Sequence, residues 1–134
     1  VRHHTFKSGS VWCEVPGGDI YFTGGISKRK EKLKEVVRIS WNSLEATQRS
    51  PMYKARECHG SVHHNNYLYA IGGLIADCHM NGCERLSVSG DRWEALQPLP
   101  QACYFVSVVV VKETDYLYAL GGRKESNSYL DVIQ

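Results

Sequence analysis

The chain has 134 residues, of which 43% are apolar and 22% charged, with a formal net charge of +2 at pH 7. This composition is typical of a small globular domain, and so low a charge gives no reason to expect nucleic acid as a partner. No apolar run approaches the roughly 20 residues of a membrane span, and the N-terminus lacks the apolar region of a secretory signal. The chain has five cysteines, an odd number, and we expect them to be free thiols in a reducing compartment. We therefore expect an intracellular, cytoplasmic protein, with no membrane partner.

The first predicted elements form a hairpin near the N-terminus. Residues 9–15 are expected to form one strand, 16–19 a turn, and 20–23 a second strand that ends at Gly24 and Gly25. Adjacent glycines at a strand end permit backbone angles or close contacts that a Cβ atom would prevent.

The following segment, 28–46, is open to two interpretations. Four residues would share one apolar face of a helix: Leu33, Val37, Trp41 and Leu44. The β-branched residues within 36–41 instead favour a strand, and the distance to the next glycine pair places a third strand there. We favour the strand and expect Trp41 to be buried.

A second hairpin follows. Residues 58–64 are expected to form a strand, and Asn65 and Asn66 a tight turn, because asparagine tolerates left-handed backbone angles. The next strand, 67–71, is apolar on both faces and should be buried on both sides. Gly72 and Gly73 then end it.

The rest of this unit completes a four-stranded antiparallel sheet. We expect a loop at 74–82, a third strand at 83–88 and a turn at 89–91. A fourth strand begins near Trp93.

The same order of strand, turn, strand and glycine pair occurs a third time, beginning with a strand at 105–111. A second strand at 116–120 ends at Gly121 and Gly122, and a third strand is expected at 129–133. The three glycine pairs are preceded by similar residues, spelling DIYFTGG, YLYAIGG and YLYALGG, and their first glycines lie 48 and 49 residues apart. A near-constant period of this size indicates one structural unit used repeatedly.

A tyrosine three residues before a glycine pair, with a tryptophan further on, resembles the kelch repeat. The matching residues are Tyr21, Gly24, Gly25, Tyr69, Gly72, Gly73, Trp93, Tyr118, Gly121 and Gly122. The resemblance implies an all-β fold made of β-propeller blades, each a four-stranded antiparallel sheet. We assign residues 1–134 to one kelch-repeat segment, with blade one at 9–54, blade two at 55–102, and blade three, lacking its last strand, at 103–134.

The number of blades is too small for a closed propeller, which usually has about four to eight. The resemblance therefore implies an incomplete propeller in this chain, whose outermost blades would expose apolar faces. We expect the missing blades to come from a longer form of the same chain or from a second copy.

Cysteine and histidine residues give a weaker signal. Cys78 and Cys83 have a spacing that zinc sites permit, but no second pair completes a recognisable site. The carboxylates are scattered, with no pair spaced for acid–base work. We expect no metal, no cofactor and no catalytic residue. The alternative is a propeller enzyme fragment, because some propellers of this kind are galactose oxidases or sugar-acid epimerases.

The resemblance implies a binding rim made of the loops after the glycine pairs and the segments that lead into the first strands. The candidate partner-binding residues are Ser27, Lys28, Arg29, Lys30, Arg56, Asp77, Asn81, Arg123, Lys124 and Asn127. Arg56 stands where kelch repeats often carry arginine, and it has a structural alternative, in which it braces neighbouring carbonyls. Loop 26–34 has three open interpretations: a solvated loop, a patch for an acidic partner, or a nuclear-import or nucleic-acid segment.

The function implied by the resemblance is that of a non-catalytic protein–protein interaction module. An acidic segment of a partner protein fits the rim, because the arginine fork makes two parallel hydrogen bonds with a carboxylate. Many kelch proteins are substrate adaptors of ubiquitin ligases, and these carry an additional BTB-type domain. An adaptor role would thus require a further domain.

Overall fold

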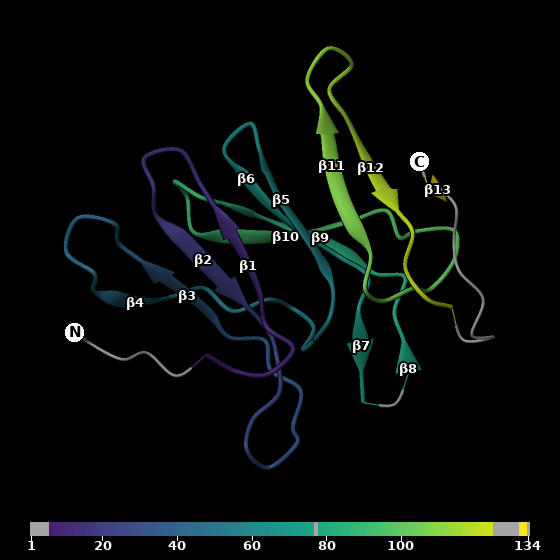
Figure 1. Cartoon of the computed structure of the whole chain (residues 1–134), viewed down its shortest axis with the longest axis horizontal. Helices are drawn as coiled ribbons and strands as arrows, with labels where there is room; N and C mark the ends of the chain where they lie inside the picture. Colours follow the sequence, from purple (N-terminus) through teal and green to yellow (C-terminus); the bar gives the residue numbers. More distant parts are fainter. Residues whose placement is uncertain (1–5, 77, 125–131, 134) are drawn as a thin grey trace.

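The computed structural model describes residues 6–76, 78–124 and 132–133, and these form strands and connecting segments without a helix. That part of the chain therefore contains no helix able to cross a membrane. The strands, drawn in Figure 1, are β1 (Val11–Glu14), β2 (Ile20–Thr23), β3 (Val36–Ile39), β4 (Ala46–Arg49), β5 (Gly60–His64), β6 (Tyr67–Ile71), β7 (Leu74–Ile75), β8 (Cys78–His79), β9 (Cys83–Ser87), β10 (Arg92–Leu96), β11 (Ser107–Val111), β12 (Tyr116–Leu120) and β13 (Val132–Ile133).

The first sheet has the order β1-β2-β3-β4, with antiparallel neighbours throughout. β3 pairs with β2 in a register that places Val36 opposite Thr23. The predicted strand is confirmed and the helical alternative for 28–46 is wrong, because this backbone forms its hydrogen bonds with β2 and β4. The strand ends at Ile39, however, and Trp41 is 65% exposed rather than buried.

The second sheet has the order β10-β9-β6-β5. Asn65 and Asn66 have φ angles of 46° and 65°, which confirms the predicted turn between β5 and β6. β6 is buried on both sides, as predicted: Leu68 belongs to one hydrophobic core and Ile71 to another. The prediction of a plain loop at 74–82 is incomplete, because β7 and β8 form a small hairpin within it.

The third sheet has the order β11-β12-β13. β12 confirms the strand predicted at 116–120, and β13 lies within the one predicted at 129–133, of which 129–131 fall outside the described residues. The first strand begins at Ser107 instead of residue 105, because Phe105 has a φ of 53°, which is left-handed rather than extended.

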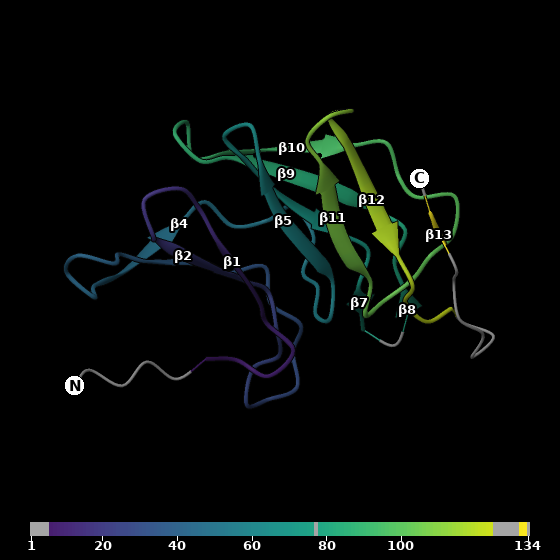
Figure 2. The same ribbon diagram turned by 45° about the horizontal axis from the view of Figure 1, so that its top comes forward.

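The three large sheets lie side by side in the manner of propeller blades (Figures 1 and 2), and their first strands, β1, β5 and β11, are in contact. One core lies between the first and second sheets and includes Tyr21, Leu68 and Trp93. The other lies between the second and third sheets and includes Tyr69 and Ala119. The sheets fall within the spans 9–54, 55–102 and 103–134, whose limits as blades stay a prediction.

The glycine pair after β6 lies directly against the segment that leads into the third sheet. Gly72 has a φ of 62°, and a Cβ atom there would lie 2.6 Å from the carbonyl oxygen of Cys103. The amide of Gly73 donates a hydrogen bond of 2.8 Å to the same oxygen. The first pair repeats this contact, with the amide of Gly25 donating to the carbonyl of Arg56 at 2.9 Å. The recurring glycines are thus required where one blade meets the next.

The two end sheets leave apolar faces open. On the third sheet, Val109, Val111 and Tyr116 are 42%, 36% and 65% exposed. On the first sheet, Phe22 and Val37 lie on the side away from the second sheet and are half-buried. This arrangement is an incomplete propeller, open at both ends.

Candidate functional site

The predicted rim segments meet at one end of the sheets. The amide of Ile26, after the first glycine pair, donates to the carbonyl of Ser8 at 2.8 Å. Leu74, after the second pair, exchanges backbone hydrogen bonds of 2.9 and 3.1 Å with Glu57. After the third pair, Arg123 does the same with Tyr104, at 2.8 and 3.1 Å. The loops that follow the glycine pairs therefore form one surface with the segments that precede the first strands.

The basic loop 26–34 has an ordered turn. The hydroxyl of Ser27 accepts hydrogen bonds from the amides of Arg29 and Glu31, at 3.2 and 3.1 Å. Lys32 forms an ion pair with Glu57, which anchors the loop to the segment before β5. Lys28, Arg29 and Lys30 are exposed. Ser27 thus organises the turn, and the three cations lie at its surface.

Arg56 lies inside the second blade, with 1% of its surface exposed. Its Nη1 donates to the carbonyls of Gly72 and Gly82 at 2.8 Å each, and its Nη2 to the carboxylate of Glu84 at 2.9 Å. Burial lowers the pKa of the guanidinium, and the charge of Glu84 opposes that effect. This geometry matches the structural alternative, in which Arg56 braces carbonyls, and it removes the side chain from the exposed surface of the chain.

The remaining candidates lie in different environments. Asn81 is exposed and its Nδ2 donates to the carbonyl of Leu99 at 3.2 Å. Arg123 and Lys124 are half-buried at the start of the last loop. Asp77 and Asn127 lie outside the described residues. The structure thus brings the basic loop, Asn81 and Arg123 to one rim but does not bring Arg56 to its surface.

A groove on this rim was missed by sequence reasoning. It has a volume of about 540 Å³ and lies between the end of loop 26–34, the segment before Arg56 and the β7–β8 hairpin. The described residues that line it are Lys34, Tyr53, Lys54, Ala55, Ile75, His79, Met80, Asn81 and Gly82. These residues come from three segments, so spacing along the chain gave no sign of the groove.

Aromatic side chains continue the surface beyond the groove. The ring of His79 packs on Tyr104, and Tyr104 on Phe105, with centroids 4.9 Å apart in each case. Phe105 is 60% exposed and has a left-handed φ, which is rare for a bulky residue. Backbone of this kind is often found at functional surfaces.

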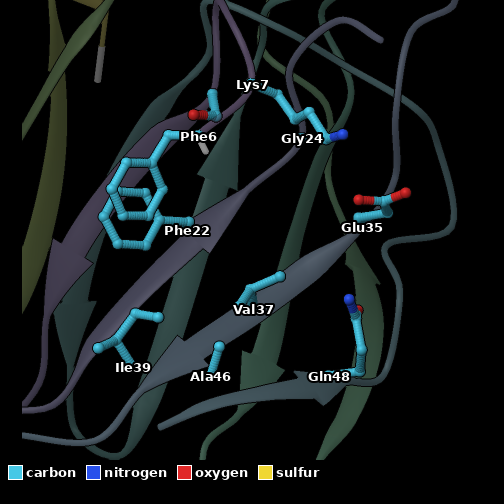
Figure 3. Close-up of a pocket in the computed structure, with 10 residues that line it drawn as sticks. Phe6, Lys7, Phe22, Gly24, Glu35, Val37, Ile39, Ala46 and Gln48 are labelled. Carbon is cyan, nitrogen blue, oxygen red and sulfur yellow. The ribbon is translucent and has the colours of Figure 1, made fainter. Parts of the chain in front are cut away.

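A second hollow lies on the open face of the first sheet, shown in Figure 3, and has a volume of about 330 Å³. Phe6 stacks on Phe22 there, with centroids 4.0 Å apart and an angle of 17° between the rings. Val37, Ile39 and Ala46 form an apolar floor beside them. In a closed propeller this face would contact a preceding blade, so its apolar character follows from the open end.

The cysteines and histidines of the described residues are not arranged as a metal site, because no three His, Cys, Asp or Glu side chains there lie close enough together. Burial raises the pKa of Cys83, and burial together with the charge of Cys83 raises the pKa of Cys103 to about 11. Both thiols are therefore protonated at neutral pH and are weak nucleophiles and ligands.

Comparison with known proteins agrees with this geometry. A family model for the kelch motif matches residues 55–100. A kelch repeat-containing protein of Dictyostelium discoideum is 29% identical over 128 residues, or 91% of this chain and 19% of its own length. Kelch repeat and BTB domain-containing protein 2 of Ectromelia virus is 29% identical over 119 residues, or 88% of this chain and 21% of its length. Kelch-like protein 38 of Rattus norvegicus is also 29% identical, over 86% of this chain and 20% of its length.

The fold has a counterpart among solved structures. The solved structure of YjhT superimposes on this chain with a TM-score of 0.78, at 12% sequence identity. The match covers 96% of this chain and 41% of the YjhT chain. The sheets and their packing thus define a segment of a β-propeller. Residues 55–100 match the kelch motif, and the chain is similar to kelch-repeat proteins. It spans about a fifth of the length of the curated relatives that it matches.

Proposed function

We propose that this chain is a non-catalytic protein-interaction segment, and that its rim binds an acidic segment of a partner protein. The observation that carries the proposal is the ordered basic loop. Lys28, Arg29 and Lys30 are exposed on a turn that Ser27 and the Lys32–Glu57 ion pair hold in place. A loop that is already ordered loses less conformational entropy when it binds.

The positive charge of this loop favours an acidic partner segment. Complementary charges accelerate encounter and favour the correct partner, more than they add affinity. Because surface charges are screened by salt, binding should weaken when the ionic strength rises from about 0.05 to 0.5 M. Nothing among the described residues favours the propeller-enzyme alternative, and we do not propose it.

For the whole protein, we propose a role as a substrate adaptor of a ubiquitin ligase. The support comes from relatives whose names include a BTB domain, among them the proteins of Ectromelia virus and of Homo sapiens. Because this chain spans only about a fifth of such relatives, the adaptor role depends on residues outside it. Within these 134 residues, the proposed task is recognition of the substrate protein.

The test is partner capture from a cell extract with the tagged chain and its variants. Lys30→Ala and Arg123→Ala should reduce the yield of the captured protein while leaving the melting temperature unchanged. Lys112→Ala is the matched control, because Lys112 is also exposed but lies in the β11–β12 turn, at the opposite end of the sheets (Figure 1). Unchanged capture by both rim variants, or loss that accompanies unfolding, would contradict the proposal.

A further inference from the structure

The groove beside the β7–β8 hairpin has the features of a preformed recognition site. Tyr53 is 61% exposed, yet its hydroxyl donates a hydrogen bond of 2.6 Å to the carbonyl of Trp93. The ring is therefore held in one orientation while one side remains open to solvent. A rigid, exposed tyrosine can provide contact area at small entropic cost.

The backbone that forms one wall of the groove is fixed from the interior. The carboxylate of Glu84 accepts hydrogen bonds from the amides of Tyr53 and Lys54, at 2.8 and 3.4 Å. The same carboxylate binds Arg56, which is also buried. The Arg56–Glu84 pair thus holds residues 53–56 in position, so Arg56 supports the rim from inside the blade.

The charged side chains known to line the groove, all from the described part of the chain, are basic. Lys34 and Lys54 are exposed and lie on its walls, and His79 lies beside them on β8. No carboxylate is among the lining residues that the structure describes, and the nearby carboxylate of Glu84 is buried and hydrogen-bonded. The rest of the lining is largely apolar, with Ile75 and Met80 among its members.

We propose that this groove binds an extended acidic peptide segment of a partner protein, with carboxylates at Lys34 and Lys54 and an apolar side chain between Tyr53 and Ile75. This inference rests on the proposed function and locates it at a specific site. A nucleic acid fits less well, because such binding depends on several phosphate contacts, and the groove offers two lysines within a largely apolar lining.

The test uses a defined probe, the peptide acetyl-Gly-Glu-Glu-Leu-Glu-Glu-Gly-amide, in an NMR titration of the isotope-labelled chain up to millimolar concentration. We expect the amide signals of residues 53–55 and 79–82 to shift progressively. The peptide with glutamine in place of each glutamate is the matched control and should leave them unchanged. Lys34→Ser and Lys54→Ser should each weaken binding about threefold to tenfold, the effect of one charge pair of roughly 1 kcal/mol, whereas Lys112→Ser should have no effect.

Three results would overturn the inference: no shift in the groove at the highest peptide concentration, equal shifts with the glutamine peptide, or tighter binding of oligothymidylate than of the acidic peptide at the same residues. Its failure can be separated from failure of the proposed function. If Lys34→Ser and Lys54→Ser capture the cellular partner normally while Lys30→Ala does not, the rim binds the partner but the groove does not. If neither these variants nor Arg123→Ala affects capture, both proposals fail.

Discussion

Arg56 and Glu84 form an ion pair inside the second blade, with Arg56 Nη2 2.9 Å from Glu84 Oε2 and side chains that are 1% and 3% exposed. The pair joins the segment before β5 to β9, and Arg56 also binds the carbonyls of Gly72 and Gly82. Neither residue is left with an uncompensated charge. The pair therefore connects the interior of the blade with the rim.

We predict that Glu84→Gln lowers the free energy of unfolding by about 3–5 kcal/mol, because it leaves the guanidinium of Arg56 buried without its counter-charge. Urea unfolding at pH 7 measures this change. Glu94→Gln is the control, since Glu94 pairs with Arg85 at the surface, where its side chain is 50% exposed. That substitution should cost at most about 1 kcal/mol. Equal, small effects of both would show that the buried pair does not support the blade.

We predict that Gly72→Val destabilises the protein by about 2–4 kcal/mol, the range for strained or overpacked positions. The reasons are the positive φ of Gly72 and the 2.6 Å approach of the Cys103 carbonyl to a Cβ atom at this site. Gly82→Ala is the control, because its Cβ would meet only the end of the Met80 side chain, at 3.9 Å. Denaturant midpoints near the parent value for both variants would contradict a special role for Gly72.

Much of the fold could be predicted from the sequence because its signals are local. The repeated glycine pairs, the double-sided apolar pattern of 67–71 and the β-branched residues at Val36–Ile39 each depend on neighbours within a few positions. Trp41 shows the limit of such signals, since a large apolar residue near a strand was expected to be buried and is exposed. Its burial depends on where the chain turns after Ile39.

The site could be predicted only in outline. The repeated order of strands and glycine pairs predicted which loops form the rim. The ion-pair partner of Arg56 is Glu84, 28 positions away, and only the sheet register brings the two residues together. The groove combines Lys34, Tyr53 and His79 from three separate segments. The sequence left open whether Arg56 binds a partner or braces neighbouring carbonyls, and only the position of the buried Glu84 carboxylate favours the second.

We predict that the free energy of unfolding decreases as the pH falls below about 6.5, because of His59. This residue is buried, with Nε2 2.7 Å from the hydroxyl of Thr23, and burial together with the charge of Arg56 lowers its pKa from 6.5 to about 3. Between these two values the unfolded chain binds a proton that the folded chain does not, so the free energy of unfolding decreases as the pH falls through this window. The slope for one proton approaches about 1.4 kcal/mol per pH unit.

Urea unfolding between pH 7 and 5, where most carboxylates remain ionised, measures this slope. The variant His59→Gln should be less stable at pH 7 but should show a shallower dependence on pH. Parallel curves for the parent and the variant would mean that His59 does not bind its proton preferentially in the unfolded state.

The open end faces should make the isolated chain associate. Val109 and Val111 expose apolar surface on β11, and a broad exposed patch of this kind favours self-association. We expect light scattering after size-exclusion chromatography to show a mass that increases with concentration. Val109→Lys should reduce this increase in mass with concentration. Thr114→Lys, which adds the same charge in the adjoining turn, should not reduce it. A concentration-independent monomer with a cooperative melt would contradict this expectation.

The central claim is that the rim is the surface through which this segment acts, and hydrogen–deuterium exchange of the chain with and without its captured partner tests it most directly. Our account predicts that the partner slows exchange in 26–34, 53–58 and 74–82. It also predicts unchanged exchange in β3 and β4, on the open face of the first sheet. Protection confined to β3 and β4 or to β11 and β12, with an unprotected rim, would show that the partner binds an open end of the propeller and would contradict the account.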